Sequence, residues 1–476
     1  MNSTFYTLQK GVLLTAPSLG QLLPRLETKP EFNHEYLAEY FYRGILHLHA
    51  SSKETLFKNI YRAPFDYQLE QGSLQADETG TLTPASAQRQ FNTLLHEAVS
   101  TCLPSTGGVG LELSGGLDSS AVAALTRHFR PHQTLSAFTN GVPTTKDRPT
   151  SPSAGYLANL ADESYFSQTV AKHLDLQHVI INDGFHFHDI IEQYTEILGC
   201  FSEILFPIFN HRCYELARER NISVLLSGFG GDEMVSQHAK LYLRELKQNK
   251  DYLTFYYELI RSKKPQAWLK LLSRKFTSVP KSDLSFEYVN YLRTPQTPPS
   301  VPDFPTVQAF EQALVQGQLS SHFMHRIETS QIIARHYGIE YHFPLTTPAL
   351  MQYFHQLPSH LKRRHGKGRY LMRHAMRDLL PNKIVWRENK AGATTPAAWA
   401  NYIRVLPELF LQRISPTHSG VMAQYVDIPR LITRFEQPAE FYDPSLLKLS
   451  LTVMMFAHLE KWLKALFNEK SVSTNS

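Results

Sequence analysis

The stretch Val109-Gly110-Leu111-Glu112-Leu113-Ser114-Gly115-Gly116-Leu117-Asp118-Ser119-Ser120 decides the fold of this chain. Its first five residues are mostly apolar, as in a buried strand, and residues 121–125, which follow it, are strong helix formers. Two glycines lie between the strand and the helix. Such a turn lets the backbone approach a ligand closely, and it aims N–H groups and the positive end of the helix at one point. The stretch therefore predicts a strand, a glycine turn and a helix that together bind a phosphate-like anion.

Strands and helices alternate along the chain beyond this unit. A helical pattern runs from about residue 87 to residue 104, and a second helix is predicted over 164–174. Further strands are predicted over 134–138, 177–181 and 224–226. This alternation predicts an α/β fold with a doubly wound parallel sheet, in which ligands bind at the carboxyl ends of the strands. After Asp232 the pattern is mostly helical, so we expect a helical C-terminal part.

The sequence divides into two expected domains. Residues 1–86 mix short apolar runs with turn residues and predict a small, mainly β module. Residues 87–476 carry the α/β pattern and the motifs. Two polar stretches, 140–159 and 262–305, are rich in Pro, Ser, Thr or Lys and are interpreted as surface insertions or lids.

The composition excludes several classes of protein. Hydrophobic residues make up 42% of the chain, which is enough for a globular core, and the net charge of +5 is too small to indicate nucleic-acid binding. Only three cysteines occur, without a C-x-x-C pair, so no disulfide framework is expected. No signal peptide and no apolar run of about 20 residues is present, so we expect a cytoplasmic protein without a membrane span.

Hydroxyl and carboxyl groups in the glycine turn indicate which anion it binds. Ser114, Ser119 and Ser120 can donate hydrogen bonds to phosphate oxygens, whereas Asp118 would repel a bare phosphate. A carboxylate is useful there as a ligand for Mg²⁺, which accompanies nucleotide phosphates. The turn differs from the nucleoside-triphosphatase P-loop because it lacks the Gly-Lys-Ser/Thr ending.

A second segment, Val224 to Glu233, repeats the design of a strand that runs into glycines and acids. It reads Val-Leu-Leu-Ser-Gly-Phe-Gly-Gly-Asp-Glu. Two strand ends in one parallel sheet can bring two carboxylates to a common Mg²⁺. Asp118 and Asp232 are therefore the predicted metal ligands.

These two segments resemble the signatures of the asparagine-synthetase-like ATP pyrophosphatases. Residues 343–392 resemble the C-terminal sequence of that family in order and spacing, so the resemblance covers about residues 87–463. It implies that ATP and Mg²⁺ are bound and that ATP is split between its α and β phosphates. The residues expected to contact ATP by this resemblance are Leu113, Ser114, Gly115, Gly116, Asp118, Ser119, Ser120, Ser227 and Gly228.

Two basic residues have expected catalytic roles by the same resemblance. Lys390 matches the family lysine that stabilises charge on pyrophosphate and on the acyl-adenylate. Arg369 stands where the family usually has a second phosphate-facing lysine, and it keeps the positive charge in a forked geometry.

The chain also departs from the family pattern. Asn2 stands where glutamine-using members have a nucleophilic cysteine, and the module before residue 87 resembles only the latter half of a glutaminase domain, so no glutaminase activity is expected. Phe229 replaces the Glu of asparagine synthetases and the Tyr of β-lactam synthetases, and Thr346 interrupts a further family pattern. Glu328 and Glu340 can be acid/base groups or ordinary structural carboxylates.

Within the superfamily, this combination most resembles the lasso-peptide macrolactam cyclases. The resemblance implies that the chain adenylates an Asp or Glu side chain of a precursor peptide, whose own α-amino group then closes a ring. The implied partners are that peptide and, in addition, a leader-binding protein and a leader protease. The alternatives are a small-molecule amide or β-lactam synthetase, an ammonia-dependent amidotransferase, a tRNA-modifying ATP pyrophosphatase and a non-catalytic scaffold.

Overall fold

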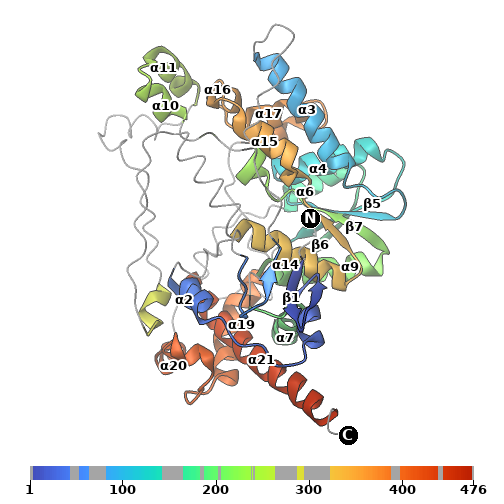
Figure 1. The fold of residues 1–476 in the computed structure, drawn as a ribbon. Helices are drawn as coiled ribbons and strands as arrows, with labels where there is room; N and C mark the ends of the chain where they lie inside the picture. Colours follow the sequence, from blue (N-terminus) through green and yellow to red (C-terminus); the bar gives the residue numbers. More distant parts are fainter. Residues whose placement is uncertain are drawn as a thin grey trace.

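The computed structural model describes residues 4–42, 53–63, 82–141, 164–182, 187–201, 205–236, 239, 242–262, 287–293, 322–387, 397–437 and 443–473. Figure 1 shows their arrangement: a central sheet lies between two groups of helices, and the last helix extends away from the body. No helix in these ranges is long and apolar enough to cross a membrane.

Five parallel strands form the central sheet, in the order β6-β5-β4-β7-β8. Their bounds are β4 Gly108–Glu112, β5 Leu135–Asn140, β6 Gln177–Ile181, β7 Ile222–Leu226 and β8 Glu340–His342. The predicted doubly wound parallel sheet is confirmed. The chain begins in the middle with β4, moves outward through β5 and β6, and returns to the other side of β4 with β7 and β8. The loops after β4 and β7 therefore flank the point where the winding reverses, where α/β sheets bind their ligands.

Strand β8 was missing from the sequence prediction. It has three residues, Glu340, Tyr341 and His342, and it lacks the apolar run by which a strand is recognised. It forms because Tyr341 and His342 pair with Leu225 and Leu226 of β7. Tertiary pairing, and not local propensity, adds this edge strand.

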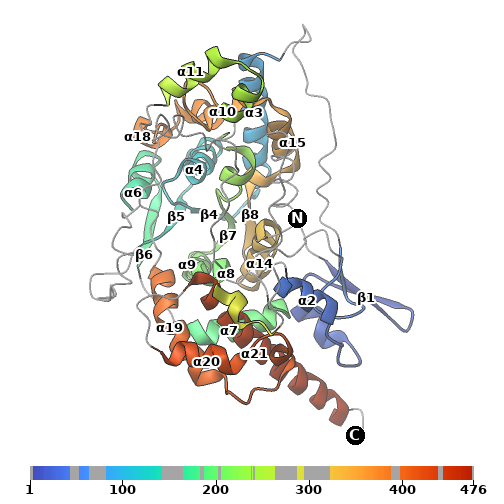
Figure 2. The same cartoon turned by 90° about the vertical axis from the view of Figure 1, so that its left-hand side faces the viewer.

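Helices cover both faces of the sheet, as the predicted fold class requires. In Figure 2, α3, α4 and α15 lie above the strands, and α7, α9 and α14 lie below them. The helical segments are α3 Pro84–Ser100, α4 Leu117–Phe129, α6 Ser164–His173, α7 Phe187–Leu198, α8 Leu205–Phe209, α9 His211–Glu219, η2 Gly231–Val235, α10 Tyr242–Gln248, α11 Tyr252–Arg261, η3 Glu287–Tyr291, α14 His322–His336, η4 Pro344–Thr346, α15 Pro348–Gln356, α16 Ser359–Lys362, α17 Tyr370–Met376, α18 Asn382–Val385, α19 Ala397–Arg413, η5 Val421–Gln424, α20 Ile428–Glu436 and α21 Pro444–Ser473.

Two helices follow directly from their sequences. Helix α3 begins at a capping box in which Thr83 and Ser86 bond reciprocally, and it buries Phe91, Leu95 and Val99 at helical spacing. Helix α4 buries every residue from Leu117 to Thr126, so it is a central helix and not a surface one. The first turn of α4 carries the motif residues, and its burial fixes their position.

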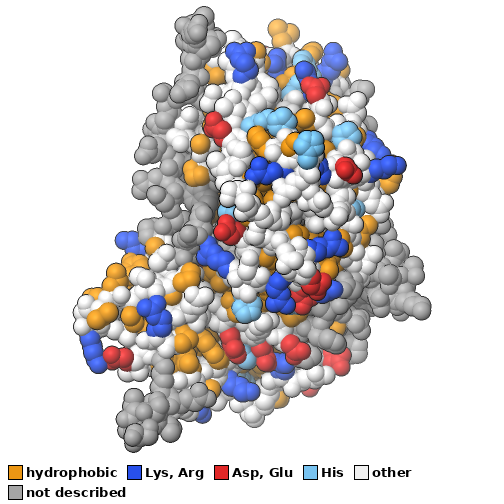
Figure 3. Space-filling view, turned by 90° about the vertical axis from the view of Figure 1, so that its right-hand side faces the viewer, with side chains coloured by type: hydrophobic (Ala, Val, Ile, Leu, Met, Phe, Trp, Pro, Cys, Tyr) orange, Lys and Arg blue, Asp and Glu red, His pale blue; other side chains and the backbone are white. Residues whose placement is uncertain are grey.

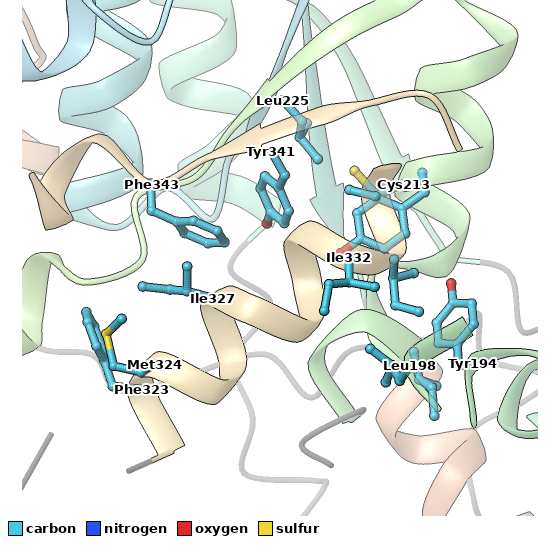
Figure 4. Close-up of a cluster of buried hydrophobic side chains, with 14 of the residues drawn as sticks. Tyr194, Leu198, Cys213, Leu225, Phe323, Met324, Ile327, Ile332, Tyr341 and Phe343 are labelled. Atoms are coloured by element: carbon cyan, nitrogen blue, oxygen red, sulfur yellow. The ribbon is translucent and has the colours of Figure 1, made fainter. Parts of the chain in front are cut away.

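Helix α14 packs under β7 and β8. Figure 4 shows Ile327 of α14 directed toward Phe343, whose ring lies 4.6 Å from that of Tyr341. These side chains belong to one large hydrophobic core that continues through the molecule. The core holds α14 beside the carboxyl end of β7.

The N-terminal module contains a small antiparallel sheet, as expected for a mainly β segment. The strands lie in the order β2-β1-β3, and the elements are β1 Phe5–Gln9, β2 Val12–Ala16, α1 Leu19–Leu22, η1 Leu23–Arg25, α2 His34–Tyr42 and β3 Tyr61–Arg62. The buried residues of this module, such as Phe5, Leu37 and Phe57, join the same core as those of the α/β part. The division into residues 1–86 and 87–476 stays a prediction.

Candidate active site

The loop between β4 and α4 has the geometry of an anion-binding turn. Gly115 has φ +71, and a Cβ there would lie 2.5 Å from the backbone nitrogen of Ser167. The hydroxyls of Ser114 and Ser119 hydrogen bond across the loop at 2.9 Å, and Ser114 Oγ also accepts from Gly116 N at 3.3 Å. Glycine is thus required at position 115 for both conformation and space. Hydrogen bonds between its own serine side chains fix the conformation of the loop.

Two glycines of the second segment press directly against the first turn of α4. A Cβ on Gly228 would lie 2.4 Å from the backbone nitrogen of Ser119, and a Cβ on Gly231 would lie 2.3 Å from Cγ of Asp118. Gly230 has φ +91 and is closed in by Thr346. Only a segment without side chains at these places can come so near to the first motif. The two motifs therefore interlock, as the sequence predicted for two neighbouring strand ends.

Two carboxylates converge on one guanidinium group at this junction. Arg369 Nη1 lies 3.3 Å from Asp118 Oδ2, and Nη2 of the same side chain contacts Asp232 Oδ1. The Arg369 side chain is only 5% exposed. Ser236 Oγ donates to the other oxygen of Asp118 at 2.6 Å. Three of the four charged residues chosen from the sequence, Asp118, Asp232 and Arg369, are thus brought to one place.

Arg373 positions the segment that carries Arg369. Its guanidinium donates to the carbonyl oxygens of Gly368 at 3.0 Å and of Arg387 at 2.9 Å, and also to that of Val385. Burial, and after it the nearby Arg369, lowers the pKa of Arg373 to about 10, although Asp118 acts in the opposite sense. A buried arginine therefore ties the turn before α17 to the residues after α18.

Of the other predicted site residues, Leu113 and Ser227 lie at the ends of central strands, and Lys390 is not described. Leu113 is buried at the end of β4, where its N–H donates to Phe138 O at 2.8 Å. Ser227 is buried at the end of β7, and its hydroxyl accepts from Phe229 N at 3.2 Å. Asn2 and Lys390 lie outside the described residues, so their expected roles stay predictions.

Phe229 lies on the α14 side of the second segment. Its ring is 5.0 Å from that of Phe323 and 6.0 Å from that of Phe343, and the Arg326 guanidinium lies 3.7 Å from its centroid. A phenyl ring cannot take part in proton transfer, so this position supplies packing and a stacked cation in place of an acid or base.

The two glutamates that were open candidates lie away from this junction. Glu328 is buried on α14 and pairs with Arg62 of the N-terminal module at 3.1 Å. Glu340 is at the start of β8, exposed, and 3.3 Å from His342 Nε2. Both are structural carboxylates by their contacts.

Sequence reasoning assigned no role to Ser236 or Arg373. Ser236 follows Asp232 within one turn, and its hydrogen bond to Asp118 joins residues far apart in the sequence. Arg373 stands four residues after Arg369, a spacing that places two residues on the same face of a helix. This spacing could have indicated that Arg373 lies beside Arg369.

The donor set fits a nucleotide phosphate with its metal ion. Ser120 is fully buried in the first turn of α4, and its hydroxyl has no hydrogen-bond partner among the described residues. Asp118 and Asp232 offer the carboxylate oxygens that Mg²⁺ prefers, and phosphate oxygens normally complete such a site. The part of the chain that the structure describes holds no group of three or more His, Cys, Asp or Glu suited to a metal ion.

The three cysteines take no part in this arrangement. All of them are free, and burial raises the pKa of Cys102 to about 11 and that of Cys200 to about 12. Thiols of such high pKa stay protonated near neutrality and are poor nucleophiles.

Comparison with known proteins identifies the family. No curated protein matches the sequence. The model of the asparagine synthase family matches residues 90–464, which is well over half of the chain and includes both motifs, Arg369 and Arg373. Members of that family use ATP, typically with Mg²⁺. This chain therefore belongs to the asparagine synthase family of ATP-dependent amide-forming ligases.

Proposed function

We propose that this ligase transfers AMP from ATP to a carboxyl group of a precursor peptide and then closes a macrolactam. The observation that carries the proposal is the convergence of Asp118, Asp232 and Arg369 where two glycine-rich strand ends interlock. A phosphate site that also contains paired carboxylates fits a metal-bound polyphosphate better than a bare anion.

The nucleotide would be held mainly by backbone groups. N–H groups of the loop from Ser114 to Ser120 and the N-terminus of α4 face the phosphates, and Ser227 and Gly228 complete the site beside the adenosine. Asp118 and Asp232 would hold Mg²⁺, which when bound would supply neutralisation of the phosphate charge. Arg369 supplies a fixed cation at the same place, and Lys390 is the proposed second one.

The reaction has two steps. A carboxylate oxygen attacks the α-phosphorus of ATP, the bond between the α and β phosphates breaks, and pyrophosphate leaves. An amine then attacks the acyl carbon, AMP leaves with the bonding electrons, and the amine gives up a proton. The net result is one amide, one AMP and one pyrophosphate, with the loss of one water from the joined groups.

The environment of Phe229 supports a substrate that carries its own amine. The ring packs against two other phenyl groups and against Arg326, and a phenyl side chain at this position cannot itself transfer the protons of ammonia. A peptide that holds its α-amino group against the activated carboxyl needs less help, because the attack is intramolecular and its effective molarity is high. A leader-binding protein and a leader protease are the partners that this proposal implies.

Mass spectrometry tests the proposal. Purified protein is mixed with ATP, Mg²⁺ and the candidate peptide, and AMP and pyrophosphate are measured in parallel. We expect the peptide to lose one water and AMP to appear in equal amount, with neither product when Asp118→Ala replaces the wild type. AMP formation stimulated by a free amino acid and by no peptide would instead identify a small-molecule ligase, and ADP as the product would refute adenylation.

A further inference from the structure

Five rings form a continuous line of contacts from α11 to the end of α18. The hydroxyl of Tyr257 lies 2.8 Å from His365 Nδ1, and the ring centroids of His365 and Tyr370 are 6.2 Å apart. The line continues from Tyr370 to His374 at 4.1 Å and from His374 to Trp386 at 5.7 Å. We call these five residues the aromatic strip. Figure 2 shows α11 and α18, which carry its two ends, on one side of the molecule.

The strip is accessible, and α11 extends it with further apolar side chains. Tyr257 is 42% exposed, His365 is exposed, and the other three rings are half-buried. Next to Tyr257, α11 also exposes Tyr252, Leu253, Tyr256 and Ile260, with Leu253 at 88%. A helix face exposed to water is normally polar, so a cluster of large apolar side chains on one helix indicates a binding surface.

Cations border the strip. The guanidinium groups of Arg261, Arg364 and Arg373 lie 5.5 Å, 5.5 Å and 6.0 Å from the ring centroids of Tyr257, Tyr370 and Trp386. The pKa of His374 is lowered first by burial and then by Arg377, Arg364 and His365, so basic residues surround this ring. The charge complementary to this surface is negative.

Glu258 is an acidic residue beside this region, and its carboxylate is bonded to backbone groups. Glu258, on the buried face of α11, accepts hydrogen bonds from the backbone N–H groups of His365 and Gly366, both at 2.7 Å. Gly366 has φ +74, and a Cβ there would lie 2.4 Å from the backbone of Arg261. Helix α11 is therefore fastened to the turn before α17.

The strip leads to the candidate active site. Tyr370 directly follows Arg369, which contacts both aspartates. Trp386 precedes Arg387, whose carbonyl is held by Arg373. A chain lying along the strip from α11 would thus arrive beside the residues that position Arg369.

We propose that the aromatic strip binds an extended segment of the peptide substrate that carries acidic and apolar side chains. The proposal rests on the proposed function, because it assigns the surface to the peptide whose carboxyl group is activated. Rings can pack against apolar side chains, and the guanidinium groups of Arg261 and Arg364 can pair with carboxylates. Exposed Leu253 and Ile260 fit a peptide better than a nucleic acid, since they offer nothing to a phosphate. Figure 3 shows Lys and Arg interspersed with Asp and Glu on the opposite side of the molecule.

Measuring peptide affinity directly tests whether the aromatic strip binds a peptide, and it needs no catalytic turnover. The probe is a fluorescently labelled peptide in which Glu and Asp alternate with Leu and Tyr, and its counterpart carries Gln and Asn instead. Labelled oligothymidylate serves as the nucleic-acid probe. We expect the wild type to bind the acidic peptide at least about tenfold more tightly than the amide peptide. The amide peptide loses one or two charge-assisted hydrogen bonds, which accounts for a difference of this size.

We expect variants at the exposed end of the strip to fold normally, and their affinities show whether the peptide binds there. Tyr257→Ala and Arg261→Glu should each weaken binding of the acidic peptide by about tenfold, because each removes one anchor. The matched controls, Leu13→Ala and Lys172→Glu, change an exposed apolar residue and an exposed cation elsewhere and should bind as the wild type does. The affinity for a non-hydrolysable ATP analogue should not change in any of the four.

The outcomes separate this inference from the proposed function. Equal affinity for the acidic and amide peptides, unchanged affinity of Tyr257→Ala and Arg261→Glu, or tighter binding of oligothymidylate than of either peptide would overturn the assignment of the strip. If the acidic peptide binds the strip as expected while no peptide is dehydrated with ATP, the strip stands and the macrolactam proposal fails. If peptides are dehydrated normally by Tyr257→Ala and Arg261→Glu at limiting concentration, the macrolactam proposal stands and the strip fails.

Discussion

Among the residues that the structure describes, two buried arginines pair with carboxylates, in two different arrangements. Arg369 lies against two carboxylates, Asp118 and Asp232, which come from the ends of different strands. Arg62 of the N-terminal module pairs with Glu328 of α14 at 3.1 Å, with His325 Nδ1 3.7 Å from the same glutamate oxygen. The side chains of Arg62 and Glu328 are 8% and 3% exposed, so this pair is the more deeply buried.

The difference in arrangement corresponds to a difference in role. Two carboxylates brought together repel one another, and a cation beside them, such as Arg369 or a bound metal ion, relieves that repulsion. A one-to-one pair between two segments has no such need and fixes how those segments meet. We infer that the first arrangement is a metal and phosphate site, and that the second fastens the N-terminal module to the helix that packs under β7 and β8.

Removal of Asp118 should have the largest effect. We expect Asp118→Ala to lower Mg²⁺-dependent AMP formation at least about 1000-fold, equivalent to ~4 kcal/mol, because one metal ligand is lost. Thermal unfolding should show that the variant still folds, since it also relieves repulsion between the two carboxylates. The matched control is Asp378→Ala, which removes an exposed carboxylate paired with Arg377. AMP formation at the wild-type rate in Asp118→Ala would show that the metal assignment is wrong.

Removal of one member of the second pair should affect stability and not chemistry. We expect Arg62→Met to lower the free energy of unfolding by about 3–5 kcal/mol, because Glu328 is left buried without its arginine. Urea unfolding measures this loss. AMP formation per folded molecule should be unchanged.

A double variant sharpens the second test. Arg62→Met combined with Glu328→Met removes both charges and should recover much of the lost stability, since a buried ion pair is often replaceable by apolar side chains. If the double variant is as unstable as the sum of the two single ones, packing and not charge explains the role of this pair.

Gly228→Ala tests how closely the two glycine-rich motifs must approach one another beside Arg369, Asp118 and Asp232. The new Cβ would lie 2.4 Å from the backbone nitrogen of Ser119, so we expect a loss of about 1–3 kcal/mol in unfolding free energy. Gly116→Ala is the comparison, because its Cβ would meet only the Ser114 hydroxyl at 3.3 Å. Equal stability of the two variants in urea would mean that the motifs can separate without cost.

His355 is a buried titratable residue that belongs to neither arginine–carboxylate arrangement, so it shows how burial affects stability. It lies on α15, its Nε2 has no partner among the described residues, and burial with the nearby Lys362 lowers its pKa to about 3. The unfolded chain takes up a proton near pH 6.5 and the folded chain does not, so stability is full above that pH and falls as the pH drops toward 3. The contribution lost at pH 5 is about 2 kcal/mol.

The matching variant is His355→Leu. Between pH 7 and pH 5, its unfolding free energy should fall by about 2 kcal/mol less than that of the wild type. The same pH dependence in both proteins would assign the acid sensitivity to other groups.

Local sequence was sufficient for the central features of the fold. The apolar run of β4, the glycines at 115 and 116 and the helix formers of α4 each favour one local structure, and the structure agrees with all of them. The place of Asp118 and Asp232 followed as well, because parallel strands that flank a reversal of winding end at the same edge.

Features that depend on distant contacts were not predictable in this way. Glu328 could be read as an acid/base group or as a structural one, and only its pairing with Arg62, which is distant in the sequence, decides between them. The hydrogen bond from Ser236 to Asp118 and the aromatic strip likewise join segments that no local pattern links.

The sequence by itself determined the strand–turn–helix unit, the parallel sheet and the acids and glycines of the two motifs, because these depend on short-range propensity and on spacing. Tertiary structure alone decided that β8 is a strand, that Arg369 lies between the two aspartates, and that α11 meets the turn before α17. Each of those results depends on which surfaces meet, and contacts between distant residues form only when the whole chain has packed.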